Sequence, residues 1–468
     1  MKQINRRDFL KTLGLAGATA TGVSLASCSG KKASDIVSGT VEHSTVPTDK
    51  MTYRQLGKDK VSLLGYGCMR WPMKEGEDGK QIVDQEQVQA LIDYAMAHGI
   101  NYYDTSPHYC QGQSETAVGL AMQKYPRDSY FLATKMSTFL DHCDNYETAN
   151  KQELQKSLAN LKTDYLDYYL IHGAGIGGMA TLHERLLDPG TLDWLEEQRQ
   201  KGVIRNLGFS FHGEVEVFDY LMKLHDEGTH KWDFVQIQMN YSDWKHATGW
   251  NVNGEYLYGE LEKRGIPTVI MEPLLGGRLA KLPNYLMREL KQRRPEESVA
   301  SWAFRFCASH KDVMAVLSGM TYMENLQDNL CTFSPLDPCT QEEYDLLEHT
   351  AVEYLKNPII ECNSCNYCMP CPYGVDIPTI LTYYNKLVNE QMMASSVNDE
   401  NYKELRRAFL VGYDRAVPAL RQADHCIGCN QCRNKCPQWI DIAGNLQMID
   451  KYVEGLKQDN LGLEEEKA

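Results

Sequence analysis

Four residues of types that handle protons stand where short apolar runs of the chain end. Asp104 closes the run 100–103, Tyr109 follows in the next loop, and Lys135 and His172 end the next two runs. A free phenol has a pKa of about 10, and a neighbouring ammonium lowers that pKa by favouring the phenolate. A carboxylate can hold the ammonium, and a histidine can orient a substrate oxygen. Together these groups could protonate or deprotonate that oxygen.

Such a group suits the interconversion of a carbonyl and an alcohol, but it contains no source of hydride. The hydride must come from a cofactor, usually a nicotinamide dinucleotide. A single charged residue at a strand end is often only a solvated cap. Three of them at the ends of consecutive runs, with a tyrosine in the loop after the first, favour a shared site.

Eight of the 15 cysteines form two tight runs near the C-terminal end of the chain. Thiolates at these intervals wrap [4Fe–4S] clusters, and the last cysteine, before proline, typically ligates the other cluster. The spacing predicts one cluster on Cys362, Cys365, Cys368 and Cys436, and a second on Cys371, Cys426, Cys429 and Cys432. Two zinc ions, each held by four thiolates, are the alternative, although a zinc site needs no third cysteine at this interval.

Short apolar runs alternate with amphipathic segments through most of the chain. The expected strands are 61–67, 100–104, 129–135, 164–172, 204–210, 234–240, 267–273 and 313–318. The expected helices are 85–98, 114–124, 151–161, 191–201, 214–225, 256–264, 297–308 and one that begins at 325. Eight alternations predict an α/β fold, a parallel (β/α)8 TIM barrel with its site at the carboxyl ends of the strands. An open doubly wound sheet is the alternative, but no G-x-G-x-x-G follows the first strand.

The composition changes after Pro358, where the cysteines are interleaved with apolar residues at helical spacing. We therefore expect the barrel over residues 51–350 and, over 351–468, a small mainly α-helical ferredoxin-like domain that carries two clusters.

The motifs around the four proton-handling residues resemble those of the aldo-keto reductase superfamily. NYYDTSPHY resembles its D-T-x-x-x-Y motif, FLATK ends in the family lysine, and DYYLIH ends in the family histidine. The resemblance covers about residues 51–336. It implies that Tyr109 is the general acid/base and that Lys135 tunes its pKa. It also implies that Asp104 is the partner of the lysine and that His172 orients the substrate.

The same resemblance implies where a nicotinamide dinucleotide binds. Ser210 in LGFS and Gln236 in VQIQMNY match residues that contact the carboxamide. The segments 271–279 and 318–329 resemble those that wrap the phosphates and the adenosine. They contribute Leu274, Gly276, Ser318, Gly319, Asn325, Asp328 and Asn329.

The chain departs from the family pattern at three places. Phe211 follows the serine where many members have asparagine, and Met271 replaces the usual aromatic stacking residue. The basic residues that commonly bind the 2′-phosphate are missing near Gly319 and Asn325. The choice between NAD and NADP therefore stays open.

The N-terminal segment resembles an export signal. Arg6 and Arg7 precede a mildly apolar run, as in a twin-arginine signal, and the run ends in Leu-Ala-Ser-Cys28, which resembles a lipobox. We expect a signal over residues 1–27, a flexible tether over 28–50, and a periplasmic protein that contacts the membrane only through a lipid on Cys28. The net charge of −15 disfavours nucleic acid as a partner.

These observations favour an exported oxidoreductase that acts on a small carbonyl or alcohol, with a sugar or polyol as a plausible substrate. A nicotinamide cofactor would exchange electrons with the clusters, and a redox protein or a quinone is a candidate electron partner. The alternative is an electron-transfer or docking protein whose barrel no longer performs turnover. A barrel hydrolase is disfavoured because the chain has no paired-carboxylate or nucleophile–base motif.

Overall fold

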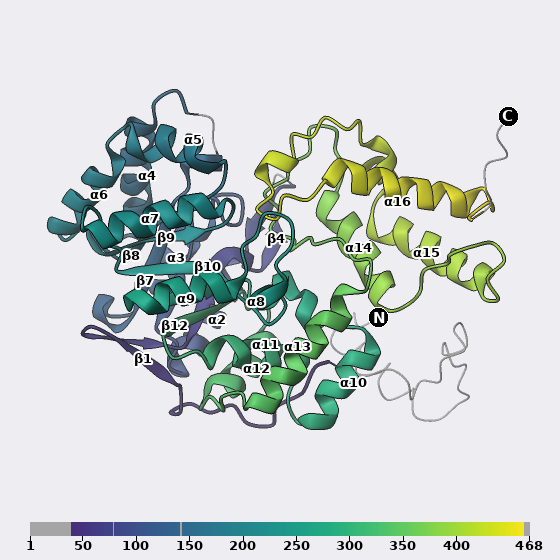
Figure 1. The fold of residues 1–468 in the computed structure, drawn as a ribbon, viewed down its shortest axis with the longest axis horizontal. Coiled ribbons are helices and arrows are strands. Elements are labelled where there is room, and N and C mark those ends of the chain that lie inside the picture. Colours follow the sequence, from purple (N-terminus) through teal and green to yellow (C-terminus); the bar gives the residue numbers. More distant parts are fainter. Residues whose placement is uncertain (1–38, 78, 141–142, 463–468) are drawn as a thin grey trace, which may run out of the picture.

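The computed structural model describes residues 39–77, 79–140 and 143–462. The expected signal, Cys28 and the first part of the expected tether lie outside these residues. Figure 1 shows a barrel surrounded by helices and, beside it, a separate helical region formed by the C-terminal part of the chain.

Eight parallel strands close into a barrel, as the alternation of apolar and amphipathic segments predicts. Around the barrel the order is β10-β11-β12-β3-β6-β7-β8-β9. The strands are β3 (Leu64–Gly67), β6 (Tyr102–Asp104), β7 (Phe131–Met136), β8 (Leu166–Ile171), β9 (Ile204–Phe211), β10 (Phe234–Gln238), β11 (Thr268–Met271) and β12 (Val313–Ser318). Every residue of β8 is buried, as expected of a strand covered on both faces.

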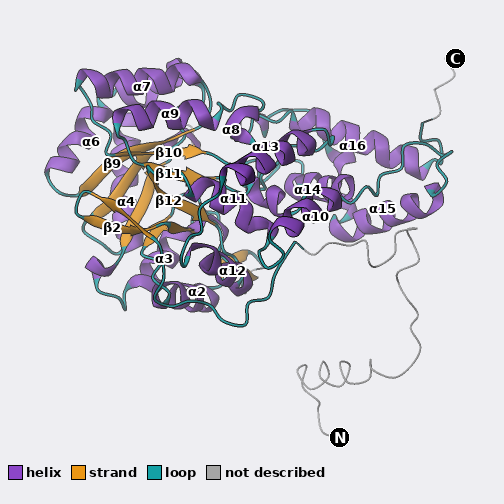
Figure 2. Cartoon of the chain, turned by 60° about the horizontal axis from the view of Figure 1, so that its bottom comes forward, coloured by secondary structure: helices purple, strands orange, loops and turns teal. Residues whose placement is uncertain are grey.

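Helices surround the strands on the outside of the barrel, as Figure 2 shows. They are α2 (Gln85–Ala97), α3 (Ser114–Met122), α4 (Tyr146–Leu161), α6 (Thr191–Gln200), α7 (Val215–Glu227), α9 (Gly254–Arg264), α10 (Asn284–Arg293), α11 (Val299–Ala308) and α12 (Met323–Phe333). Two shorter helices are α5 (Gly178–Leu182) and α8 (Asp243–His246).

Three local features differ from the sequence-based expectation. The first expected strand is divided, because β2 (Asp59–Ser62) forms an antiparallel hairpin with β1 (Tyr53–Leu56) before β3 begins. A second hairpin joins β4 (Met73–Glu75) to β5 (Gln81–Val83). Helix α4 begins five residues earlier than expected, because the side chain of Asn145 caps it by accepting a hydrogen bond from the Thr148 N–H.

The barrel interior is filled with side chains. Val61 of the first hairpin packs there against residues from the strands, including Tyr102, Tyr168, Phe234 and Met314. The hairpin thus contributes to the barrel core, and the space available to a ligand lies toward the carboxyl ends of the strands.

The C-terminal region has its own hydrophobic core. That core joins α14 (Ile377–Asn389), α15 (Tyr402–Ala416) and α16 (Ile442–Lys457). The amphipathic spacing of these helices predicts their burial, and a second core supports a separate domain. Among the described helices, none combines the length and apolar character that crossing a bilayer requires.

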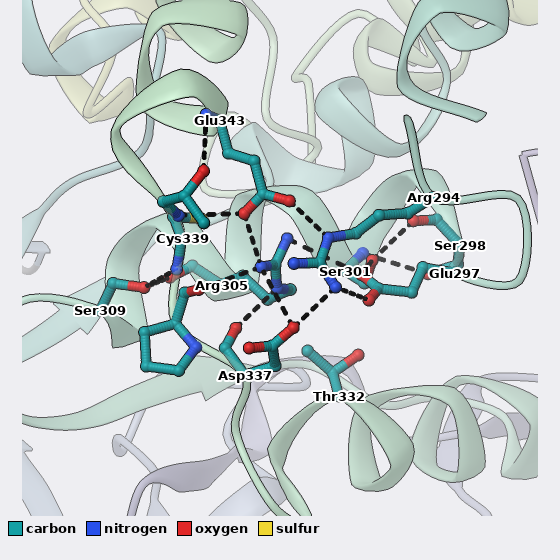
Figure 3. Close-up of polar contacts among 12 residues, drawn as sticks. Arg294, Glu297, Ser298, Ser301, Arg305, Ser309, Thr332, Asp337, Cys339 and Glu343 are labelled. Atoms are coloured by element: carbon teal, nitrogen blue, oxygen red, sulfur yellow. Dashed lines mark hydrogen bonds and ion pairs between the residues drawn. The ribbon is translucent and has the colours of Figure 1, made fainter. Parts of the chain in front are cut away.

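Helix α13 (Gln341–Leu355) leads from the barrel to the first cysteine run and is fixed by buried charges. Arg305 of α11 and Arg294, just after α10, both donate hydrogen bonds to the carboxylate of Glu343, at 2.8 and 2.5 Å (Figure 3). Thr340 and Glu343 also form a capping box at the start of the helix. The link between the two domains is therefore firmly attached to the barrel.

Candidate active site and cluster-binding segments

The expected lysine–carboxylate pair is present in the barrel. Lys135 on β7 donates a hydrogen bond of 2.5 Å to Oδ1 of Asp104 on β6, and both side chains are buried. The Lys135 ammonium also donates to the Thr105 carbonyl oxygen at 2.8 Å. Adjacent parallel strands bring these two residues together, as expected from their positions at strand ends.

Tyr109 lies beside this pair, in the turn that follows β6. The Lys135 ammonium is 4.8 Å from the centre of the Tyr109 ring and thus faces the ring. Burial raises the pKa of Tyr109 well above its ordinary value, and the carboxylates of Asp104 and Glu272 raise it further. The expectation of a lowered pKa is therefore not met in this structure, because burial has the largest effect and raises the pKa. A raised pKa means that Tyr109 carries its proton at neutral pH.

His172 follows β8 and closes the site on a third side. Its Nδ1 is hydrogen-bonded to the Ser137 hydroxyl at 2.6 Å, and that hydroxyl is also 2.9 Å from the Ser106 hydroxyl. Burial lowers the pKa of His172 well below its usual range, and the positive charge of Lys135 adds to this effect. A neutral His172, held through Nδ1, leaves Nε2 as the ring nitrogen that can hydrogen-bond a substrate oxygen.

A cavity of about 340 Å³ joins most of the expected site residues at the carboxyl ends of the strands. Its lining includes Asp104, Tyr109 and His172 of the proton-handling group. It also includes eight of the residues expected to bind the dinucleotide, namely Gln236, Leu274, Gly276, Ser318, Gly319, Asn325, Asp328 and Asn329. One continuous space thus connects the proton-handling residues with the expected adenosine end.

Ser210 is the expected cofactor contact that does not line this cavity. It is fully buried, and its hydroxyl oxygen accepts a hydrogen bond of 2.9 Å from the Gly173 N–H. Gln236 lies at the cavity wall, where its amide donates to Oδ2 of Asp104 at 3.2 Å. In this structure Ser210 therefore supports the loop after β8, and Gln236 braces the carboxylate that holds Lys135.

The thiols that influence one another agree in part with the two groups of cysteines predicted from the spacing. Burial raises the pKa of the Cys365 thiol to about 12, and the nearby Cys436 and Cys362 contribute. In the other group, burial is the main cause that raises the pKa of Cys432, and it is raised further by the nearby Cys426, Cys429 and Cys371. Cys436 thus lies near the first run and Cys371 near the second, but Cys432 of the second run also raises the pKa of Cys368. The division into two sets of four ligands stays a prediction.

A second cavity, of about 100 Å³, lies within the C-terminal domain. The cysteines that line it are Cys368, Cys371, Cys426, Cys429 and Cys432. No three His, Cys, Asp or Glu side chains among the described residues approach closely enough to hold a single metal ion. A thiolate-lined space of this kind fits a cluster with several iron atoms, each bound by one cysteine.

Comparison with known proteins is decisive for the larger domain. A model of the aldo/keto reductase family matches residues 63–351, more than half of the chain. The chain belongs to the aldo/keto reductase family. Its members are oxidoreductases, in agreement with the geometry of Tyr109, Lys135 and His172. A 4Fe–4S dicluster domain model matches residues 361–442 of this reductase.

Individual relatives match the barrel domain over nearly their whole length. "Uncharacterized oxidoreductase YqkF" of Bacillus subtilis is 27% identical over 335 residues, which are 65% of this chain and 99% of that protein. L-galactose dehydrogenase of Arabidopsis thaliana is 24% identical, over 66% of this chain and 96% of that protein. The holo form of aldo-keto reductase AKR11C1 from Bacillus halodurans has a TM-score of 0.50 and 25% identity, covering 64% of this chain and 96% of its own.

The far end of the main cavity has donors and acceptors suited to a dinucleotide. Asn329 donates to the Ser318 hydroxyl at 2.9 Å, and the Lys281 side chain offers a cation for a phosphate. Asp328 is paired at 2.9 Å with His43, which belongs to the expected tether. Gly276 and Gly277 have φ angles of +66° and +99°, so the loop after β11 turns tightly beside the cavity. These residues fit a nicotinamide dinucleotide in the reductase barrel.

The first cysteine run packs directly on the mouth of the barrel. Arg70 donates to the backbone carbonyls of Asn363 and Ser364, at 2.5 and 3.2 Å. A Cβ on Gly276 would lie 2.3 Å from the Asn363 carbonyl oxygen, so the two backbones are in close contact. The segment 362–365 therefore covers the loop after β11.

The second run is attached to the barrel by aromatic and amide side chains. Trp250 stacks on Trp439 with 4.3 Å between ring centres and donates to the Pro437 carbonyl at 2.9 Å. Gln438 donates to the Gln238 side chain at 3.0 Å. Cys365 of the first run and Pro437 beside the second run therefore both line the cavity that Tyr109 lines.

Among the cavity-lining residues that sequence reasoning missed are Arg70, Glu272 and Tyr367. Glu272 follows β11 directly, in the segment MEPLLGGRL. A carboxylate at the end of a barrel strand is a sequence signal that could have indicated this residue. Tyr367 stands between two cysteines, and no local pattern indicates that it reaches the barrel. Only the packing of the two domains brings it to the site.

Proposed function

We propose that this aldo/keto reductase interconverts a carbonyl and an alcohol on a small, sugar- or polyol-like molecule and exchanges electrons with two [4Fe–4S] clusters. The proposal rests mainly on one cavity that both domains line. Tyr109 and His172 of the barrel contribute to its wall, and so does Cys365 of the first cysteine run. L-galactose dehydrogenase among the relatives supports a sugar-like substrate. The partner that takes or supplies electrons would be a redox protein or a quinone.

The chain's own residues would perform the proton chemistry. In the reductive direction Tyr109 donates its phenolic proton to the developing alkoxide oxygen, and neutral His172 donates a hydrogen bond to the same atom. Lys135 and Asp104 keep the floor of the site in place through their buried hydrogen bond. NAD or NADP would supply or accept the hydride when bound.

The clusters would provide one-electron steps beside this site. We assign Cys362, Cys365, Cys368 and Cys436 to the cluster near the barrel, and Cys371, Cys426, Cys429 and Cys432 to the distal one. Interconversion of the reduced and oxidised nicotinamide would involve two electrons and one proton, and each cluster would carry one of the electrons, so two clusters match the electron count of one turnover. The close packing of the first run on the barrel supports short transfer distances.

The test is the Tyr109→Phe variant, assayed with NADH and NADPH against a panel of aldoses and small aldehydes. We expect kcat to fall roughly 10²- to 10⁴-fold, because the proton donor is lost. Nucleotide affinity and iron content should remain unchanged. Tyr285→Phe is the matched control, since Tyr285 is 37% exposed on α10, away from the cavity.

Undiminished turnover in Tyr109→Phe would remove the tyrosine from its proposed role. If the wild-type protein bound neither nucleotide and converted no carbonyl, the electron-carrier alternative would replace the enzyme.

We also propose that the protein is exported by the twin-arginine route and anchored through Cys28. The signal-like residues Arg6 and Arg7 support this, together with the need to insert clusters before export. Replacing both arginines with lysine should leave the protein in the cytoplasmic fraction. Unchanged fractionation between the variant and the wild type would contradict this route.

A further inference from the structure

The first described part of the expected tether, residues 39–46, lies against the barrel at the far end of the main cavity. The Gly39 carbonyl oxygen accepts a hydrogen bond of 2.8 Å from the Val299 N–H at the start of α11. A Cβ on Gly39 would lie 3.2 Å from the Ala280 carbonyl oxygen, so the segment also touches the loop after β11. Ala280 and Ala300, the residue after Val299, both line the cavity. The segment is therefore attached directly beside the cavity wall.

The same segment also reaches α12, whose residues Asp328 and Asn329 line the cavity. Nε2 of His43 is 2.9 Å from Oδ1 of Asp328, and the two side chains are only 20% and 16% exposed. Two residues further along, the Thr45 carbonyl oxygen accepts a hydrogen bond of 3.8 Å from the Cys331 thiol. The segment thus joins three elements of the barrel that form the far end of the cavity, namely the loop after β11, α11 and α12.

The contact between His43 and Asp328 affects a group that a ligand can use. A carboxylate accepts hydrogen bonds from amino and hydroxyl groups, and adenosine carries an amino group on its base and hydroxyls on its ribose. His43 is bonded to Oδ1 of Asp328, so Oδ2 is the oxygen that can accept a hydrogen bond from the ligand. A side chain that is already held by a neighbour loses less freedom when a ligand binds, and this favours binding.

We propose that residues 39–46 form part of the dinucleotide site, that they close its adenosine end, and that His43 is a positioning residue that orients Asp328 toward the adenosine. This inference rests on the proposed function, which requires a nicotinamide dinucleotide. The match to the aldo/keto reductase family begins at residue 63. This part of the site is therefore supplied by a segment that precedes the matched region.

The test is the affinity of the full, cluster-loaded chain for ADP-ribose, which contains the adenosine and both phosphates but no nicotinamide. Isothermal titration calorimetry compares the wild type with His43→Ala and His43→Gln. Binding to His43→Ala should be roughly tenfold weaker, the lower end of what a hydrogen bond to a charged group contributes. His43→Gln should bind nearly as well as the wild type, because its amide can still donate to Asp328. The control is His349→Ala on α13, since that side chain is 53% exposed and lies away from the cavity lining.

Hydrogen exchange of the backbone amides measures the closure of the site without relying on affinity. In the wild type, binding of ADP-ribose should slow exchange in residues 39–46 and at the Val299 N–H, which donates to Gly39. The slowing should be smaller in His43→Ala. Exchange that ADP-ribose leaves unchanged in residues 39–46 would contradict their closing the adenosine end.

Equal affinity for ADP-ribose in the wild type and His43→Ala would overturn the proposal, and so would a wild-type protein that does not bind ADP-ribose. Equal weakening in His43→Gln and His43→Ala would also overturn it, because lost packing would then explain the effect. If binding depends on His43 as expected but no carbonyl is converted, the inference is supported and the proposed reaction is rejected instead.

Discussion

Tyr109 is surrounded by two carboxylates that differ in their partners. Asp104 is hydrogen-bonded to Lys135 and Gln236. For Glu272, burial raises the pKa of the carboxyl group and the charge of Arg70 opposes that effect. The sequence predicts Asp104 because it ends an apolar run. Glu272 follows β11 in a left-handed conformation, with φ at +55°, and no spacing rule indicates its proximity to Tyr109. The identities of the proton-handling residues were thus predictable, but the direction of the tyrosine's pKa shift was not, because burial decides it.

Replacing Glu272 with glutamine should lower the pH at which Tyr109 ionises. The Glu272 carboxylate raises the pKa of Tyr109, so Glu272→Gln lowers that pKa. The loss of carbonyl reduction at high pH should then begin at lower pH. The measurement is the pH dependence of kcat, with Glu75→Gln on the exposed end of β4 as the control. A shift to higher pH, or none, would contradict this electrostatic role.

At the level of elements, apolar runs predicted all eight barrel strands, since buried parallel strands leave a continuous apolar signal. Hairpins and helix starts were less predictable. The strand β2 continues almost directly into β3, so one apolar run conceals two strands with different pairing. The start of α4 depends on a single hydrogen bond that the Asn145 side chain accepts from the Thr148 N–H. Such local contacts depend on geometry that the hydrophobic pattern does not contain.

The buried charges that attach α13 to the barrel should be essential to stability. Burial alone would raise the pKa of Glu343, but hydrogen bonds from Arg294 and Arg305 bring it to about 2. Glu343→Gln should lower the free energy of unfolding at pH 7 by about 3 kcal/mol, because the buried guanidinium of Arg305 and the partly exposed one of Arg294 lose their shared carboxylate. Thermal unfolding measures the effect. The control is Glu342→Gln, which alters a side chain that is 79% exposed and should change little.

The pH dependence of this effect has a definite sign. The pKa of Glu343 is lowered in the folded state, so its stabilisation is complete above the ordinary glutamate value of about 4.3. It is lost as the pH falls toward 2. The difference between wild type and Glu343→Gln should therefore shrink over that range. A constant difference from pH 7 to pH 2 would argue against the ion pairs as its source.

For the whole molecule, the sequence predicted a reductase barrel and a 4Fe–4S domain, but not how the two domains pack. Cysteine intervals are short-range and follow from cluster geometry. The packing depends on contacts between distant residues, such as Arg70 with Asn363 and Trp250 with Trp439. These contacts place the first cysteine run over the loop after β11, where the nucleotide is expected. Because of these contacts, residues of the barrel and of the cluster-binding domain line one proposed site.

The proposal that the barrel and the clusters form one electron path can be tested most directly by EPR. Protein purified without air, with oxidised clusters, is mixed with NADH or NADPH and frozen at increasing times. We predict that signals of reduced [4Fe–4S] clusters appear and approach two per chain. If the nucleotide binds and dithionite produces these signals, but neither nucleotide does, the barrel and the clusters do not exchange electrons and the proposed coupling is wrong.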